Sequence, residues 1–256
     1  MTKRQVINIV GLAFTLVING LANALPLNGV TTGDVSDNIP SLFTPAGYVF
    51  AIWGVIYFFL IAFAIYQALP AQRENPRLER IGFWFFLSNI FNGTWIFFWH
   101  YGLWFLTEVA MLGLLISLIF LYVRAGIGKS QPKFWERFSI DIPFGIYLGW
   151  ISVATIANTA NLLYVNELLI GNLNIQAVLT VAMLVIGAVL GLLMILLRKE
   201  VAFPLVLIWA YGGILSKRID MPAIAITAGI AMAVLAVALL LSIFKLKIVK
   251  TKSTPA

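Results

Sequence analysis

The sequence predicts an all-α membrane protein, a polytopic bundle of about eight transmembrane helices with both termini in the cytoplasm. Hydrophobic residues make up 61% of its 256 residues and charged residues only 11%, whereas soluble domains hold about half and about a quarter. The mean hydropathy is +0.98. The apolar residues also gather in runs of about 20, the length that an α-helix needs to cross a hydrocarbon core of about 30 Å.

Eight apolar runs are candidate spans. They are residues 6–25, 48–69, 81–100, 103–123, 141–164, 174–197, 201–216 and 221–244. The seventh run is the shortest, and it contains Pro204 and the Gly212–Gly213 pair. Proline and glycine both weaken a helix interior, so the ends of this helix are the least well defined. The longest connection, residues 26–47, carries aspartates and prolines, which favours a loop outside the membrane.

The basic residues orient these spans. If the N-terminus lies inside, all of the 17 Lys and Arg except Lys217 and Arg218 fall on cytoplasmic segments, as the positive-inside rule requires. We therefore expect a multi-pass protein of the cell membrane, the cytoplasmic membrane of a bacterium, with the lipid bilayer as its partner. The net charge of +7 then reflects topology and contact with anionic headgroups rather than a nucleic-acid partner.

The first run has an alternative interpretation as a secretory signal. Lys3, Arg4 and the small residues at 22–24 have the pattern of such a signal and its cleavage site. The run is long for a signal and contains Asn19, which favours a helix that is retained.

The fifth run concentrates its polar and aromatic residues on one face. At 100° per residue, Tyr147, Trp150, Ala154, Asn158 and Asn161 occupy a stripe about 80° wide. Asparagine is costly in hydrocarbon unless it is hydrogen-bonded, so this face should point into the bundle. Two interpretations stay open: hydrogen bonds that join the helices, or the lining of a pocket.

Depth in the membrane favours a pocket. With this topology, indoles, amides and one carboxyl share the outer half of the bundle. They are Asn23, Trp53, Asn92, Trp95, Trp104, Glu108 and Asn158. An aromatic belt at the membrane interface is the alternative, and it accounts for Trp99, Tyr101 and Trp104. It does not account for Trp150, which should lie nearer the middle of the membrane.

Four segments carry motifs that occur together in a known family. They are FTPAGYVFAIWGVIY (43–57), NGTWIFF (92–98), GLWFLTE (102–108) and YLGWISVATIAN (147–158). In this order they resemble the tryptophan-rich sensory protein family (TspO/MBR, the translocator protein family). The matching positions are Pro45, Trp53, Tyr57, Asn92, Trp95, Phe97, Phe98, Trp104, Glu108, Tyr147, Trp150, Ala154 and Asn158.

The resemblance implies a five-helix unit over residues 1–165, with residues 26–45 as a lid, that binds planar hydrophobic ligands such as tetrapyrroles or sterol-like molecules in an outer-half pocket. The ligand-binding residues that it implies are Trp53, Asn92, Trp95, Trp104, Trp150, Ala154 and Asn158. Tyr147 and Glu108 complete our candidate set. Thr159 replaces a family tyrosine, and no basic residue follows it before Arg198, so sterol binding there is not supported.

Residues 166–256 add three helices and a basic C-terminal tail to the five-helix unit. We expect them to pack on it, with Gly187 and Gly191 suited to close helix contact. They would cover the face that family members use to dimerise, so a monomer and a homodimer both remain open.

Composition argues against an enzyme. The chain has one histidine, His100, and no cysteine, so no His or Cys cluster can hold a metal, and it carries no nucleophile or phosphate-loop motif. We expect no catalytic residue, no metal and no cofactor beyond a possible tetrapyrrole ligand.

A small secondary transporter that uses Glu108 is the alternative function. Glu108 is an acid within a span, where a proton-coupled site, a partner for a cationic ligand and a structural hydrogen-bonded acid all stay open. No internal repeat of the kind found in many transporters is visible.

Overall fold

The computed structural model describes residues 1–25, 27–168 and 172–252, with side chains as far as residue 244. Pro26, the first residue of the expected lid, and the side chains of the basic C-terminal tail lie outside that description. Within these ranges the regular structure is helical throughout, without strands, which confirms the all-α class.

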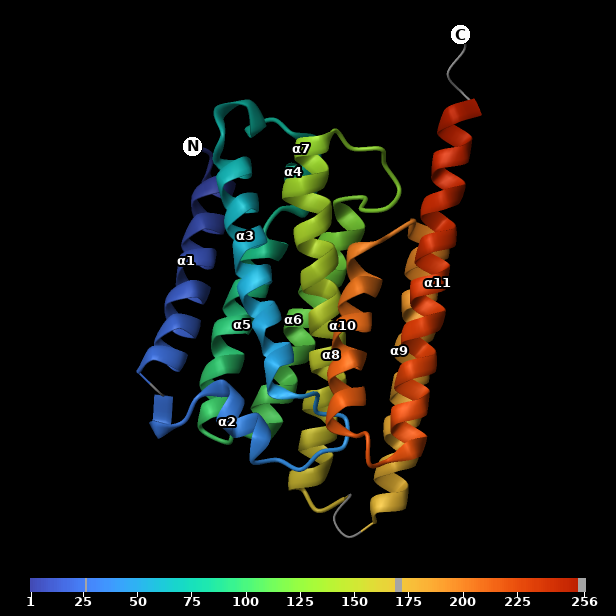
Figure 1. Cartoon of the computed structure of the whole chain (residues 1–256). Helices are drawn as coiled ribbons and strands as arrows, with labels where there is room; N and C mark the ends of the chain where they lie inside the picture. The colour runs from blue at the N-terminus through green and yellow to red at the C-terminus, as the bar shows by residue number, and fades with distance from the viewer. Residues whose placement is uncertain (26, 169–171, 253–256) are drawn as a thin grey trace.

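Long helices run side by side through the molecule (Figure 1). They are α1 (Lys3–Ala24), α3 (Ile52–Ala68), α5 (Trp84–His100), α6 (Trp104–Arg124), α8 (Ile142–Val165), α9 (Leu173–Arg198), α10 (Ala202–Lys217) and α11 (Pro222–Lys252). Six described helices are long and apolar enough to cross a membrane. The remaining two, α5 with 17 residues and α10 with 16, pack between longer neighbours.

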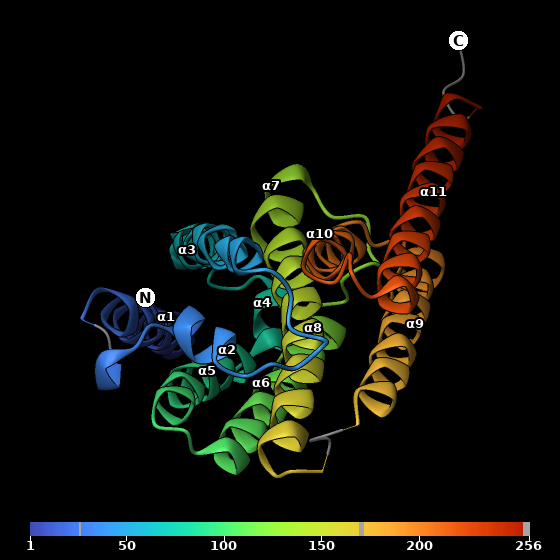
Figure 2. The same cartoon turned by 60° about the horizontal axis from the view of Figure 1, so that its bottom comes forward.

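Short elements occupy the two ends of the bundle. They are η1 (Leu27–Gly29), α2 (Thr32–Asp37), η2 (Gly47–Ala51), η3 (Pro70–Gln72), α4 (Pro76–Ile81), α7 (Phe134–Glu136) and the π-helical η4 (Arg137–Asp141). Residues 27–46, which contain η1 and α2, are called the outer loop below. Figure 2 shows the outer loop crossing the end of the bundle over α8 before it enters α3.

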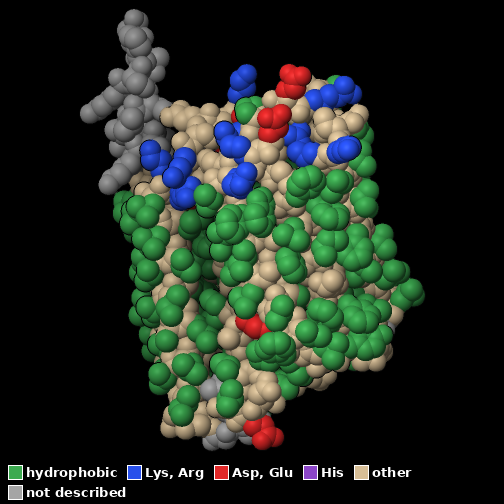
Figure 3. Space-filling model, turned by 180° about the vertical axis from the view of Figure 1, so that it is seen from behind, with side chains coloured by type: hydrophobic (Ala, Val, Ile, Leu, Met, Phe, Trp, Pro, Cys, Tyr) green, Lys and Arg blue, Asp and Glu red, His purple; other side chains and the backbone are tan. Residues whose placement is uncertain are grey.

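Charge separates the two ends of the molecule. Lys and Arg side chains gather at one end, above a broad hydrophobic band (Figure 3). The start of α1 and the end of α11 both lie at this basic end (Figure 1). The positive-inside rule makes it the cytoplasmic end, which agrees with the expected position of both termini and makes the outer loop extracytoplasmic.

Among the C-terminal helices, α10 makes the main contact with the rest of the bundle. It packs against α8, while α9 and α11 pack against each other and against α10. Gly187 and Gly191 on α9 leave room for Tyr211 on α10 and Leu235 on α11. The expected close helix contact is therefore present, because small residues let membrane helices approach each other.

Buried charges hold the cytoplasmic end together. Arg77 on α4 pairs with Asp141 of η4 and donates its Nε to the Ala125 carbonyl at 3.0 Å. Glu200 precedes α10, where its carboxylate accepts from the Tyr122 hydroxyl at 3.0 Å and from the Ala202 amide at 2.9 Å. Burial raises the pKa of the Glu200 carboxyl, although these hydrogen bonds oppose the shift.

Candidate functional site

A cavity lies in the outer half of the bundle, between α3, α5, α8 and the outer loop. Its atom-free space is about 500 Å³, a figure that includes the open mouth. Its lining residues are Thr32, Ser36, Thr44, Pro45, Phe50, Trp53, Trp95, Trp99, Trp150, Val153, Ala154, Ala157, Asn158 and Asn161.

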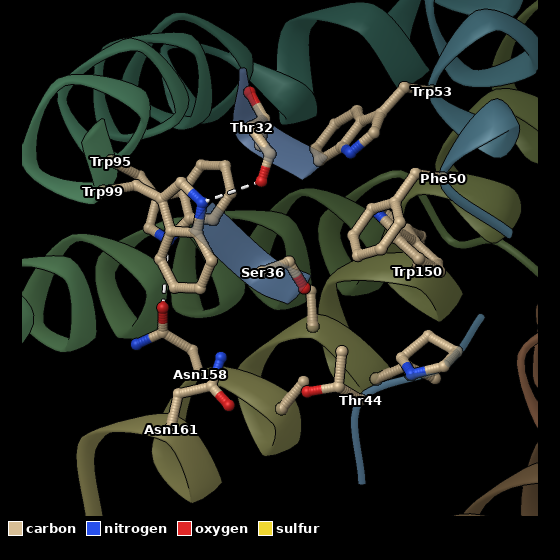
Figure 4. Close-up of a pocket in the computed structure, with 14 residues that line it drawn as sticks. Thr32, Ser36, Thr44, Phe50, Trp53, Trp95, Trp99, Trp150, Asn158 and Asn161 are labelled. Atoms are coloured by element: carbon tan, nitrogen blue, oxygen red, sulfur yellow. Dashed lines mark hydrogen bonds between the residues drawn. The ribbon is translucent and has the colours of Figure 1, made fainter. Parts of the chain in front are cut away.

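Aromatic rings form two opposite walls of this cavity (Figure 4). On one wall Trp95 and Trp99, one turn apart on α5, stack with ring centroids 5.4 Å apart. On the other wall Trp150 meets Trp53 edge-on at 6.2 Å and Phe50 at 5.8 Å. Indole faces offer large, rigid apolar contact areas, so the space between the walls suits a flat apolar molecule.

Hydrogen bonds fix the first wall. The Trp95 Nε1 donates to Asn158 Oδ1 at 3.1 Å, and the Trp99 Nε1 donates to the Thr32 carbonyl at 3.2 Å. Asn158 lies on α8 and Thr32 in the outer loop, so both indoles are tied to neighbouring elements. The two rings are therefore oriented before any ligand arrives.

Three polar atoms of lining residues have no hydrogen-bond partner in the described parts of the chain. They are Trp150 Nε1, Asn161 Oδ1 and Thr44 Oγ1, and their residues are 2%, 2% and 1% exposed. Leaving such a group unpaired costs about 1–3 kcal/mol, so a bound molecule or water should satisfy them. Together they offer one donor, one acceptor and one hydroxyl that can serve as either.

Five of the nine candidate residues line the cavity. They are Trp53, Trp95, Trp150, Ala154 and Asn158. Ala154, with the neighbouring Val153 and Ala157, presents short side chains. Ala154 belongs to the stripe that the sequence predicts on α8, as do Trp150 and Asn158, whereas Val153 and Ala157 lie outside that stripe.

Asn92 and Tyr147 lie behind the walls instead. The Asn92 Nδ2 donates to the Tyr147 hydroxyl at 3.0 Å, while its Oδ1 accepts from Asn19 at 2.8 Å. These bonds join α1, α5 and α8. For these residues the structure therefore supports the first of the two interpretations, hydrogen bonds that join the helices. Tyr147 also meets Trp53 edge-on at 6.2 Å, so it supports a cavity residue without lining the space.

Trp104 and Glu108 on α6 also lie behind the cavity wall, where they contact lining residues without lining the cavity themselves. Trp104 lies edge-on to Trp99 with centroids 5.5 Å apart. Glu108 accepts from Asn158 Nδ2 at 2.6 Å and from the Thr159 hydroxyl at 2.7 Å. Thr159, the departure from the family's tyrosine, therefore acts as a hydrogen-bond donor to this carboxylate.

The assignment of Trp99 to an interfacial belt is wrong. Trp99 is 5% exposed and lines the cavity, whereas Tyr101, another of the three residues assigned to the belt, is 47% exposed. The signal was present in the sequence, because a residue four positions after Trp95 shares its helix face. Asn161 likewise belonged to the stripe on α8 but not to the candidate set.

The sequence predicted other lining residues only as part of a segment and not as individual positions. Thr32, Ser36, Thr44 and Pro45 fall within the expected lid, and Phe50 follows it in η2. Among the residues whose side chains are placed, no three of His, Asp or Glu gather as a metal site would require. The polar groups that line the cavity belong to indole, amide and hydroxyl side chains.

Comparison with known proteins gives one match. Residues 5–241 match the family described as "TSPO-like protein". The matched region includes α9, α10 and most of α11 as well as the five helices that carry the sequence motifs. No curated protein and no solved structure matches the chain.

Proposed function

The chain belongs to the TSPO-like protein family, and on that premise we propose that its outer-half cavity binds a flat hydrophobic molecule, to sense it or to move it. The observation that carries this proposal is the pair of facing aromatic walls. A flat conjugated ring between Trp95–Trp99 and Trp53–Trp150 would meet an aromatic ring on either side.

The polar atoms narrow the class of ligand. Trp150 Nε1 can donate a hydrogen bond to an acceptor on the ligand, and Asn161 Oδ1 can accept one from a donor. Thr44 Oγ1 can do either. A ligand that is apolar throughout would leave all three unsatisfied. A tetrapyrrole combines a flat conjugated ring with polar groups at its edge, and it is the class that we propose.

Glu108 supports a second candidate, a small transporter. One hydrogen bond joins its carboxylate to Asn158, and Asn158 in turn holds Trp95 at the cavity. A change at Glu108 would therefore be transmitted to the cavity through these two hydrogen bonds. The test is ligand flux through the membrane. If Glu108→Gln abolishes this flux and leaves binding unchanged, a transporter is supported over a sensor.

Titration with protoporphyrin IX in nanodiscs tests the binding proposal. Wild type should show saturable binding, followed by the ligand's own absorbance. Trp150→Ala should weaken binding at least about tenfold, or about 1.4 kcal/mol, because it removes part of one wall and the indole donor that has no partner in the described chain. Trp135→Ala is the matched control, since this indole is 65% exposed on α7.

Two outcomes would contradict the proposal. One is a linear, non-saturating signal for wild type, which indicates partition into the lipid. The other is an equal loss of affinity in Trp150→Ala and Trp135→Ala, because the cavity would then have no special role.

A further inference from the structure

The outer loop closes the cavity and rests on the outer end of α10. The Ala46 amide donates to the Gly213 carbonyl at 3.2 Å, and the Trp209 Nε1 donates to the Val49 carbonyl at 3.0 Å. Gly213 has no Cβ, and one placed there would collide with Val49 and press on Pro45. The end of the loop can therefore lie directly against the helix.

Two basic residues at the end of α10 hold the middle of this loop. Arg218 donates its Nη2 to the Ser41 carbonyl at 2.7 Å and its Nε to the Leu42 carbonyl at 3.2 Å. A guanidinium suits such paired acceptors because its donors form a rigid fork. This contact joins residues that are 177 and 176 positions apart in the chain.

Lys217 makes a second, more exposed contact. Its Nζ donates to Asp37 Oδ1 at 3.2 Å and to the Pro45 carbonyl at 3.3 Å. The Asp37 side chain is 61% exposed, so salt should screen this ion pair. The Arg218 contacts go to backbone carbonyls and depend less on salt.

These contacts enclose the part of the loop that lines the cavity. Ser36, Thr44 and Pro45 are lining residues, and the acceptors for Lys217 and Arg218 lie between positions 37 and 45. Fixing this stretch therefore fixes one side of the cavity. The unpartnered atoms of Trp150, Asn161 and Thr44 are buried, and movement of this side would widen the way to them.

The position of these two residues is unusual for a membrane protein. Lys217 and Arg218 are the exceptions to the concentration of basic residues at the cytoplasmic end, and positive charge on the outer side opposes the topology rule. A local role in holding the loop explains why they stand there.

We propose that Lys217 and Arg218 are positioning residues that hold the outer loop closed over the cavity, so that α10 sets the rate of ligand exchange. This inference rests on the proposed binding function. A closed loop blocks entry and also retains a bound ligand. Loosening it should therefore raise the association and dissociation rate constants together and leave the dissociation constant nearly unchanged.

Stopped-flow binding of protoporphyrin IX in nanodiscs tests this gate. Arg218→Gln should raise both rate constants at least about fivefold, with the dissociation constant changed less than about threefold. Arg218→Lys should restore part of the wild-type behaviour because it keeps the charge. Lys199→Gln, an exposed lysine at the cytoplasmic end of α9, is the control and should leave both rates unchanged.

Salt separates the two contacts. Raising ionic strength from about 0.05 M to about 0.5 M, which shortens the Debye length below 10 Å, should speed exchange in wild type. Lys217→Gln should start faster and respond less to salt. This variant replaces a side chain that is 26% exposed, and it also serves if Arg218→Gln fails to fold.

Hydrogen–deuterium exchange distinguishes failure of the gate from failure of the binding proposal. Without any ligand, backbone amides of residues 36–46 should exchange at least about fivefold faster in Arg218→Gln than in wild type. Unchanged exchange together with unchanged binding rates overturns the gate. If amide exchange is faster in Arg218→Gln but wild type shows no saturable binding, the contacts of the loop with α10 are supported and the proposed ligand is rejected.

Discussion

In the described chain both ends of the bundle contain buried polar atoms without a hydrogen-bond partner, Arg77 Nη1 at the cytoplasmic end among them, but only those at the outer end line the cavity. At the cytoplasmic end, Arg77 is bonded to Asp141 and Ala125, and Glu200 accepts from Tyr122 and from the start of α10. At the outer end, polar atoms of Trp150 and its neighbours in the cavity wall have no partner in the described chain. Paired groups join helices, whereas unpaired groups beside an open space indicate where a ligand binds.

This difference predicts that the two ends respond oppositely to substitution. Changes at the cytoplasmic end should lower stability and leave the affinity of the folded protein unchanged. Changes in the cavity should lower affinity and leave stability unchanged or increased. Denaturation measures the stability of each variant below, and titration measures the affinity of Asn161→Leu.

Arg77→Ala should have the largest effect. It leaves Asp141 buried without its partner, and removing one member of a buried ion pair costs about 3–5 kcal/mol. We expect this loss in the free energy of unfolding, measured by denaturation in mixed micelles. Arg73→Ala, an exposed arginine nearby, should change it little.

A loss below about 1 kcal/mol for Arg77→Ala would place this pair among weak surface salt bridges. The cytoplasmic end would then not be the more strongly held one, and the comparison would lose its first half.

Asn161→Leu should show the opposite pattern. Its Oδ1 has no described partner, so an apolar residue of similar size should leave the free energy of unfolding unchanged or raise it by up to about 1–3 kcal/mol. Affinity for protoporphyrin IX should fall about tenfold. Titration and denaturation on the same preparation measure the two changes.

Marked destabilisation of Asn161→Leu with unchanged affinity would show that this amide joins helices, as Asn92 does. The unpaired atoms of the cavity would then carry no information about a ligand.

Glu200 should give the smallest effect, visible as a dependence of stability on pH. Burial raises the pKa of this carboxyl above its ordinary value of 4.5. The folded state therefore favours the protonated form, so the contribution to stability is full below pH 4.5 and is lost as the pH rises through the raised pKa. Glu200→Gln should lack this loss.

Thermal denaturation of both proteins, followed by intrinsic tryptophan fluorescence across this pH range, measures the difference. Parallel pH profiles for wild type and Glu200→Gln would show that another group is responsible for the dependence.

The fold could be predicted because the membrane allows few alternatives. In hydrocarbon, backbone groups must pair within a helix, so apolar runs of sufficient length become helices. The stripe on α8 could be predicted for the same reason. Its members Trp150, Ala154 and Asn158 line the cavity, since a fixed turn per residue decides which side chains share a face.

Which interior residues line the cavity and which lie behind its walls could not be predicted in this way. Periodicity shows that Asn92 and Tyr147 face the interior, but only the arrangement of α1, α5 and α8 in the bundle makes Asn92 a partner of both Tyr147 and Asn19. Trp99 was assigned wrongly because indoles at interfacial depth serve both a belt and a pocket. The contacts of Arg218 with the outer loop join distant parts of the chain, and local patterns carry no signal for them.

An experimental structure of the protein in nanodiscs with bound protoporphyrin IX would test the central claim most directly. We predict the flat ring between the Trp95–Trp99 wall and the Trp53–Trp150 wall, with a polar edge group about 2.7–3.2 Å from Trp150 Nε1 or Asn161 Oδ1. A ligand seated on the lipid-facing surface, with this cavity still closed and empty, would contradict the account.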